Sequence, residues 1–258
     1  MINLLPLERH KIILDLLAKN KIVKVGELVD IFDVSTETIR RDLEELEANN
    51  KLERIYGGAV PIITSSDEPE YNVRAISNPG HKECIGKLAA EFIEDRDTII
   101  LDIGTTCLEI AKNIKDKNIT VLTTSLPITN ELANTNVRLY CLGGLVRPNE
   151  LSMSGGITEY VLNQFHVDKA FIGAGGISLN DGISDYNIEE AQIRKQCMTR
   201  AQKVFLVSDY SKFGINSFAH VASLDAVDTL ITDWDSNEDI LNKIRKLNID
   251  VVVAKKPE

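Results

Sequence analysis

The stretch VSTETIRRDLEELEANNKLERIYGG, Val34 to Gly58, decides how the first part of this chain folds. Ser35 is a good helix N-cap, because its hydroxyl can accept a hydrogen bond from a free backbone N–H. Apolar residues then recur at the spacing of one helix face: Ile39, Leu43 and Leu46. Steps of about 100° per residue turn other side chains away from that face: Thr36, Arg40 and Arg41. The stretch therefore predicts a helix with polar and basic groups pointing outward from its first turns.

Two further helices are predicted before this one. Pro6 suits a first helical turn, and an apolar stripe follows it: Ile12, Ile13, Leu16 and Leu17. A second, shorter stripe is formed by Leu28, Val29 and Phe32. Asp33 and Val34 then make a tight connection to Ser35. Two short helices joined tightly, the second with an outward polar N-terminal half, are typical of a helix-turn-helix that places a recognition helix in the major groove of DNA.

The segment KLERIYGGAV after the third helix reads as a short extended ribbon with a glycine turn, which is typical of a wing. Arg54 lies on this ribbon, where it can touch a phosphate, and Tyr56 can be either packing or contact. Instead of contacting DNA, Arg41 can form a surface ion pair with Glu37 or Glu45 across one helical turn. Such a pair is worth about 0.2 to 0.5 kcal/mol.

Charge and composition limit the possible functions. A chain of 258 residues with 43% hydrophobic content can bury the core of more than one small domain. Its net charge of -10 argues against a general binder of polyanions, so contact with nucleic acid must depend on a local cluster. The first 60 residues hold 9 Lys and Arg against 11 Asp and Glu. This acidic balance favours the alternative that they form a protein-binding module.

Cysteine and histidine spacing predicts neither a disulfide nor a metal site. The four cysteines lie far apart, with no C-x-x-C pair, and the four histidines do not cluster near them. No cofactor is expected either, since the GAGG stretch is not a dinucleotide fingerprint. No apolar run approaches the roughly 18 to 20 residues that a membrane helix needs, so we expect a cytoplasmic protein without membrane contact.

The segment from about Arg9 to Ala59 resembles the winged helix-turn-helix of the DeoR family of bacterial transcription regulators. The resemblance is carried by Val34-Ser35, by Thr38-Ile39-Arg40-Arg41-Asp42-Leu43, and by Leu52, Arg54, Gly57 and Gly58. It implies binding to operator DNA. The residues expected to carry that binding are Ser35, Thr36, Glu37, Thr38, Arg40, Arg41 and Arg54, with Thr36 and Glu37 as base readers and the arginines as phosphate anchors.

A connector and a larger α/β domain are predicted after residue 60. Residues 61–80 are rich in proline, serine and acidic side chains, which is typical of a linker. Beyond them, short apolar runs alternate with helical patterns: TIILDIGTT, ITVLTTSLP, VRLYCLGG, KAFIGAGG, KVFLVSD, DTLITD and IDVVVA. This alternation predicts a mostly parallel sheet. The predicted domains are therefore 1–60, the linker 61–80, and 81–258.

Ligands of such sheets usually bind beyond the carboxyl ends of the strands. Gly104, Thr105 and Thr106 come between a strand and a helix, as do Thr124 and Ser125, so hydroxyls and backbone N–H groups can converge there on an anion such as phosphate. Lys212 follows another strand and can neutralise the same anion. Each feature has a plainer alternative, because Gly-Thr-Thr is often only a helix cap and a loop lysine is usually solvated.

Five motifs, DIGTT, TTSLPITNELA, LGGLVRPNE, FIGAGGIS and SDYSKFG, occur in the order seen in the effector-sensing domain of the DeoR family. This resemblance implies a fold similar to ribose-5-phosphate isomerase and CoA transferases, and an operon repressor released from DNA by a phosphorylated sugar or a related metabolite. The matching positions are Asp102, Gly104, Thr105, Thr106, Thr124, Ser125, Gly144, Gly175, Asp209 and Lys212. Glu190 either joins them or is only a first-turn acid favoured by the helix dipole.

Three further expectations concern assembly, mobility and catalysis. Because one recognition helix buries little surface, we expect a homo-oligomer, at least a dimer. We expect the glycine-rich segment from Gly175 to Asn187 to be a flexible loop that ligand orders. The rival function is a phosphosugar isomerase with Asp102, Glu190 or Asp209 as acid or base, but no convergent pair of carboxylates is evident, so we expect no enzyme activity.

Overall fold

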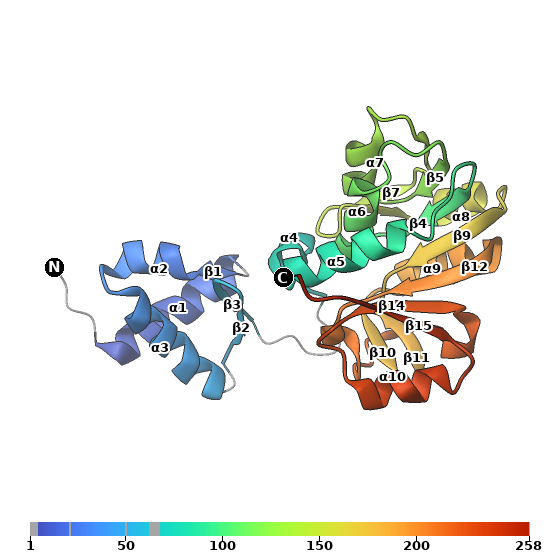
Figure 1. Ribbon diagram of the computed structural model, residues 1–258. Coiled ribbons are helices and arrows are strands. Elements are labelled where there is room, and N and C mark those ends of the chain that lie inside the picture. The colour runs from blue at the N-terminus through green and yellow to red at the C-terminus, as the bar shows by residue number, and fades with distance from the viewer. Residues whose placement is uncertain (1–4, 21, 50, 62–67, 258) are drawn as a thin grey trace. The chain divides into compact units, whose positions relative to one another are not determined.

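The computed structural model describes residues 5–20, 22–49, 51–61 and 68–257. It divides into two compact units, one made of Met1–Thr64 with Asn72–Asn78 and the other of Ser65–Tyr71 with Pro79–Glu258. Each unit has its own hydrophobic core. Figure 1 shows both units, with most of their helices and strands labelled.

The described residues of the first unit up to residue 61 form three helices and a small sheet. The helices are α1 (Pro6–Asn20), α2 (Val25–Phe32) and α3 (Thr36–Ala48), as the sequence predicts. The predicted ribbon is the hairpin of β2 (Glu53–Ile55) and β3 (Gly58–Val60). A third strand, β1 (Val23–Lys24), pairs antiparallel with β3 and was not predicted, because two residues are too short to show a pattern.

The turn between α2 and α3 is sharp and locally specified. Asp33 ends α2 with φ 51°, in the left-handed region that aspartate tolerates better than most residues. Ser35 caps α3 as predicted, since its Oγ accepts a hydrogen bond from the Thr38 N–H at 3.1 Å. The apolar faces of the three helices then meet in one core: Ile13, Leu17, Leu28, Phe32, Ile39, Leu43 and Leu46. The helix-turn-helix follows from these features.

The region predicted as a linker includes regular structure. Residues 62–67 lie outside the described part of the chain, but α4 (Tyr71–Ile76) falls within 61–80, and α5 (Pro79–Ala90) begins there. Tyr71 and Val73 are buried, although acidic and polar residues dominate the composition of this region. The domain boundaries themselves stay a prediction.

The second unit is built on a sheet of seven parallel strands in the order β15-β14-β12-β9-β4-β5-β6. The seven predicted apolar runs form these strands: β4 (Thr98–Leu101), β5 (Thr120–Thr123), β6 (Arg138–Cys141), β9 (Val167–Ile172), β12 (Ala201–Val207), β14 (Thr229–Asp233) and β15 (Asp250–Ala254). The mixed α/β fold class is thus confirmed. The order reverses between β4 and β9, so their carboxyl ends flank a topological switch point.

Alternate residues along the strands enter two separate cores, one on each face of the sheet. Figure 1 shows the helices that cover the two faces. Ile99 and Leu101 pack on the side of α5, α6 (Thr105–Lys112) and α7 (Leu126–Leu132). Ile100 packs on the side of α9 (Ile188–Arg200) and α10 (Glu238–Arg245). Burial on both faces explains why the strands read as nearly continuous apolar runs.

Smaller elements complete this unit. After β6 come the hairpin β7 (Leu145–Arg147) and β8 (Ser152–Ser154), then α8 (Gly156–Leu162). A three-stranded antiparallel sheet contains β10 (Gly176–Ser178), β11 (Gly182–Asp185) and β13 (Ala219–Ala222). Short 3-10 turns span Tyr210–Lys212 (η1) and Leu224–Ala226 (η2). Among the described residues, no helix is both long and apolar enough to cross a membrane.

The expectation of a flexible loop from Gly175 to Asn187 is wrong in one respect, because this segment contains the β10–β11 hairpin. Its turn uses Gly182, whose φ of 76° suits glycine, and the hairpin pairs with β13. The glycines that suggested mobility instead serve a tight turn and close strand packing: a Cβ on Gly182 would lie 2.2 Å from the Ala222 carbonyl oxygen.

Candidate functional sites

The outward face of α3 is arranged as the sequence predicts. Ser35, Thr36, Glu37, Arg40 and Arg41 are exposed, and Thr38 is half-buried. Ser35 and Thr38 share a hydrogen bond between their hydroxyls at 2.9 Å, so both also stabilise the start of the helix. The same turns of α3 therefore combine a fixed backbone with accessible polar and basic side chains.

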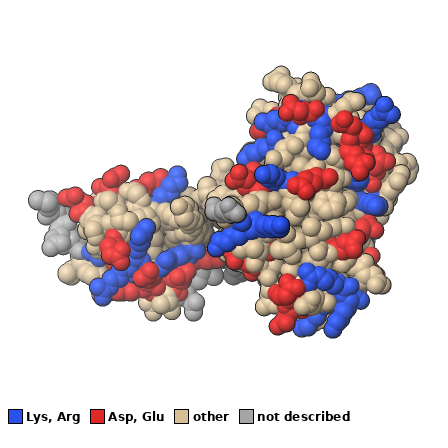
Figure 2. Space-filling view, in the orientation of Figure 1, with Lys and Arg blue, Asp and Glu red and all other residues tan. Residues whose placement is uncertain are grey.

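Two of the predicted arginines have carboxylate partners. The Arg41 Nε lies 3.7 Å from the Glu45 Oε1, with both side chains more than half exposed, so the surface pair considered above does form and is weak. Arg54 lies 2.6 Å from Glu44 and 3.9 Å from Glu47. Acidic and basic groups accordingly alternate over the visible face of this unit (Figure 2). Arg54 neutralises carboxylates of α3, which composition alone did not suggest.

A buried ion pair joins α3 to α1. Arg9 donates two hydrogen bonds to Asp42, from Nε to Oδ2 at 2.7 Å and from Nη2 to Oδ1 at 2.9 Å. The His10 Nε2 lies 3.1 Å from Asp42 Oδ1. Bidentate geometry of this kind fixes orientation as well as distance. Asp42 therefore sets how α3 lies on α1, a role that its position in the RRDL motif did not reveal.

Tyr56 is the residue of the wing whose role the sequence left open. It lies in the turn between β2 and β3 and is 91% exposed, next to Gly57 with φ 80°. A side chain so exposed does not pack in the core. Tyr56 thus joins the accessible residues of this unit.

In the second unit, the parallel register aligns the strand ends along one edge. Leu101 pairs with Phe171 and with Thr123, and Val207 pairs with Ile231. The residues that follow β4, β5, β9, β12 and β14, or end them, therefore lie along this carboxyl edge: Asp102, Thr124, Gly173, Asp209 and Asp233. The register thus brings Asp102, Thr124 and Asp209, predicted from separate motifs, to one side of the sheet.

Two helices begin at this edge, in the loops where an anion site is predicted. Gly104 is the N-cap of α6, with φ 112°, and as a glycine it has no side chain to cap the helix. Of the two threonines that follow, Thr105 is buried and Thr106 is half-buried. Ser125 caps α7, its Oγ accepting from the Ile128 N–H at 3.3 Å, and Thr124 beside it is buried. Ser125 is thus a helix cap, and Gly104 of the Gly-Thr-Thr stretch, to which the helix-cap alternative applied, occupies the N-cap position of α6.

A buried charge network lies at the switch point. Arg194 of α9 donates from Nε to the Asp102 Oδ2 at 2.6 Å and also pairs with Asp185. The Gly173 N–H donates to the same Asp102 oxygen at 3.0 Å. All three charged side chains are at least nine-tenths buried, with two carboxylates around one guanidinium. The sequence offered no means of finding Arg194, which is 92 residues from Asp102.

Glu190 is a first-turn acid of α9, as one of its two interpretations has it, and it also belongs to a second buried network. It is in the first turn of α9, where the Asn187 side chain caps its N–H, and its Oε1 accepts from Ser152 and pairs with Arg147, each at 2.5 Å. Arg147 also donates to Glu68, from the region predicted as a linker, at 2.6 Å. Burial raises the pKa of Glu190, while Ser152 and Arg147 lower it.

The remaining predicted positions differ in what they can do. Gly144, with φ 124°, packs so closely that a Cβ would lie 2.1 Å from the Thr158 Oγ1, so its role is steric. Gly175 donates its N–H to the Ser184 carbonyl at 2.9 Å. Asp209 caps η1 by accepting from the Ser211 N–H at 3.0 Å. Lys212, half-buried in η1, has its ammonium 6.0 Å from the centre of the Tyr186 ring.

Comparison with known proteins covers both units. Residues 9–65 match the model of the DeoR-like helix-turn-helix domain, and residues 77–234 match that of the DeoR C terminal sensor domain. An uncharacterized HTH-type transcriptional regulator of Bacillus subtilis, YulB, is 38% identical over 89% of this chain and 90% of its own. The HTH-type transcriptional repressor GlcR of the same organism is 32% identical, over 97% of each chain.

A solved structure of ribose 5-phosphate isomerase A from Methanocaldococcus jannaschii covers 53% of this chain and 55% of its own, at 17% identity and a TM-score of 0.41. That likeness concerns the fold alone. The family matches cover most of the sequence, and they fall on the capped helix-turn-helix and on the parallel sheet described above. The chain therefore belongs to the DeoR family of transcriptional regulators.

Proposed function

We propose that this protein is a sequence-specific repressor of a carbohydrate operon, and that a phosphorylated sugar releases it from DNA. Residues 1–60 form the domain that binds the operator, and residues 81–258 form the domain that senses the effector. Residues 61–80 are the linker between these two domains. The observation that carries the DNA-binding part is the first half of α3, where Thr36, Glu37, Arg40 and Arg41 are exposed on a helix held by a cap and a buried ion pair. The relative GlcR is named a transcriptional repressor, which supports repression rather than activation.

In this proposal Thr36 and Glu37 read base edges, while Arg40, Arg41 and Arg54 anchor phosphates, with Tyr56 near the same backbone. Ser35 and Thr38 fix the helix start. One such helix covers a single half-site, so the repressor acts as at least a dimer, in the cytoplasm, on half-sites roughly 34 Å apart or a multiple of that. The weak exposed pair of Arg41 with Glu45 leaves Arg41 available to DNA.

Arg41→Ala is expected to weaken specific and non-specific DNA binding together, because a phosphate contact carries no sequence information. The slope of log affinity against log salt should fall by about one unit for each phosphate that the protein no longer neutralises. Fluorescence anisotropy with labelled DNA from upstream of the protein's own gene measures both the affinity and its dependence on salt. Arg245→Ala is the matched control, since Arg245 is an exposed arginine paired with a carboxylate in α10. Unchanged affinity and slope in Arg41→Ala would refute the assignment.

The effector site is placed at the carboxyl edge of the sheet. The start of α6, with Gly104, Thr105 and Thr106, offers N–H groups and hydroxyls to a phosphate, and Thr124, Ser125 and Lys212 complete its surroundings. Asp102, Asp209 and Glu190 line this edge, and Gly144 and Gly175 shape its loops. The carboxylates already hold Arg194, Arg147 or a helix start, which supports binding over acid-base chemistry and leaves the protein without an assigned enzyme activity.

Lys212→Ala is expected to keep operator affinity without metabolite and to lose the response to it, because the ammonium contacts phosphate and not DNA. The measurement is operator anisotropy during titration with a panel of pentose 5-phosphates and hexose 6-phosphates. Lys203→Ala provides the control, since Lys203 is an exposed lysine near the opposite end of β12. If Lys212→Ala responds at the concentration that releases the unmodified protein, the effector site lies elsewhere.

A further inference from the structure

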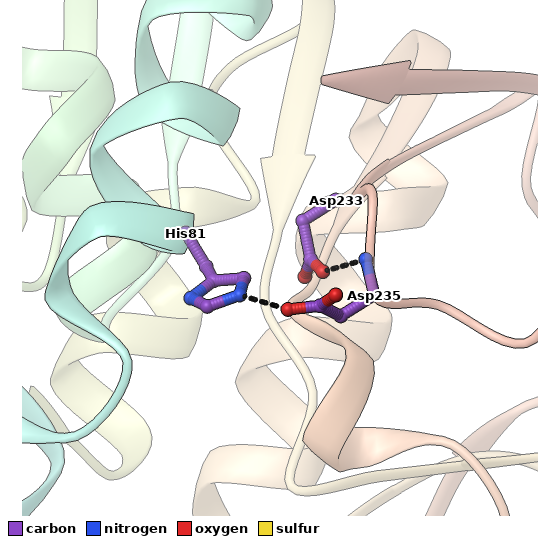
Figure 3. Close-up of side chains that lie close together, drawn as sticks. All are labelled: His81, Asp233 and Asp235. Carbon is purple, nitrogen blue, oxygen red and sulfur yellow. Dashed lines mark hydrogen bonds and ion pairs between the residues drawn. The ribbon is translucent and has the colours of Figure 1, made fainter. Parts of the chain in front are cut away.

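Three potential metal ligands meet beside the end of β14 (Figure 3). His81 is in the first turn of α5, Asp233 ends β14, and Asp235 is in the turn that follows. The His81 Nε2 lies 2.8 Å from the Asp235 Oδ2, and one donor atom from each of the three residues falls within 4.8 Å of the others. Residues more than 150 positions apart in the chain thus form one compact donor set.

The structure holds each of these side chains in place. Asp233 is wholly buried, and it accepts hydrogen bonds from the Tyr210 N–H at 2.8 Å and the Asp235 N–H at 2.9 Å. The second bond turns the chain so that Asp235 faces His81. The His81 ring stacks on Trp234, with centroids 4.4 Å apart, and also contacts Tyr210. Outer contacts that orient ligands in this way are typical of metal sites.

The spacing suits a small divalent ion. Metal bonds of about 2.0 to 2.2 Å separate two donors by about 2.8 to 3.1 Å at a right angle, and by about 3.3 to 3.6 Å in the tetrahedral arrangement usual for zinc. His81 Nε2 and Asp235 Oδ2 are 2.8 Å apart in their hydrogen bond, so a separation of less than about 1 Å more would admit an ion between them. One imidazole and two carboxylates favour zinc or manganese over magnesium, which prefers oxygen ligands alone. We propose that His81, Asp233 and Asp235 bind a divalent transition-metal ion.

Exposure supports this assignment. Asp235 is 52% exposed and His81 20%, so an ion can enter from solvent and keep open coordination positions for water. A second group of carboxylates, Glu68, Asp185 and Glu190, is also close together, but Arg147 and Arg194 already pair with its members, and we assign no ion there.

The test is isothermal titration of chelator-treated full-length protein with Zn²⁺, Mn²⁺ and Mg²⁺. We expect one Zn²⁺ or Mn²⁺ per chain, with Mg²⁺ weaker. His81→Gln and Asp235→Asn should each weaken binding at least about tenfold, because even the loss of an outer contact that orients a ligand typically costs about 10- to 100-fold. Since Trp234 is the one tryptophan of the chain and stacks on His81, paramagnetic Mn²⁺ should also quench its fluorescence, and these variants should abolish the quenching at the same concentration.

His220→Gln is the matched control, because His220 is an exposed histidine on β13 outside the cluster, and it should bind as the unmodified protein does. Absence of binding would leave His81 and Asp235 as a simple hydrogen-bonded pair and overturn the proposal. Binding that persists in both His81→Gln and Asp235→Asn would place the ion elsewhere and also overturn it. Neither readout involves DNA or a sugar phosphate, so the outcome is independent of the proposed function.

Discussion

Replacing Arg9 with methionine is expected to destabilise the helix-turn-helix by about 3 to 5 kcal/mol, because it leaves Asp42 buried without its guanidinium partner. A unit of this size has only a few kcal/mol of stability in reserve. Its helices should therefore lose protection from amide hydrogen exchange, which mass spectrometry of peptides from α1 and α3 would show. Trp234 lies in the other unit, so the unfolding transition followed by its fluorescence should stay unchanged.

Two further variants separate the buried pair from general damage to these helices. Arg41→Met removes an arginine from an exposed pair on α3 and should change protection little, since such pairs contribute about 0 to 1 kcal/mol. Arg9→Met combined with Asp42→Leu should recover much of the protection, because replacing both charges by apolar groups of similar volume is often neutral. Full protection in Arg9→Met alone would show that Asp42 does not depend on Arg9.

In the second unit, Arg194→Met is expected to be the most damaging change, again by about 3 to 5 kcal/mol, because one guanidinium serves two buried carboxylates. Without the Arg194 guanidinium, Asp102 and Asp185 are two buried carboxylates with no cation between them. Urea unfolding followed by Trp234 fluorescence measures the effect on this unit directly. We expect a lower midpoint with little change in slope, as for a loss of stability alone.

Rescue decides whether charge is the cause. Adding Asp102→Asn and Asp185→Asn to Arg194→Met removes the unpaired charges and keeps acceptors for neighbouring N–H groups, so the midpoint should rise well above that of the single variant. Arg245→Met, from the exposed pair with Glu238, serves as the control and should lie near the unmodified protein. A triple variant as unstable as Arg194→Met would mean that packing of the Arg194 side chain, and not its charge, is what the core needs.

Local signals made much of the fold predictable. The Ser35 cap, the apolar stripe of α3 and the seven apolar runs of the sheet each depend on residues close in sequence, and all appear as expected. The short strand β1 and the β10–β11 hairpin were missed, because their form depends on partners supplied by the rest of the fold.

The place of several candidate residues on the sheet could be predicted from the sequence, but their ion-pair partners could not. Strand-end placement follows from topology, so Asp102 and Asp209 could be located by sequence motifs. Their partners could not, since the pairs of Asp102 with Arg194 and of Glu68 with Arg147 join segments that share no periodicity. The same limit hid the cluster of His81 with Asp233 and Asp235, because the spacing along the chain that identifies most metal motifs is absent from it.

The buried pair of Arg9 and Asp42 has a consequence for how relatives of this protein can diverge. The angle of α3 is set from its inner face, while Thr36, Glu37 and Arg40 have no part in that attachment. Substitutions at these outer positions should therefore carry little stability cost, as is usual for exposed sites. Gene duplicates could then acquire new target sequences by changing a few outer residues, while inheriting the same docking geometry.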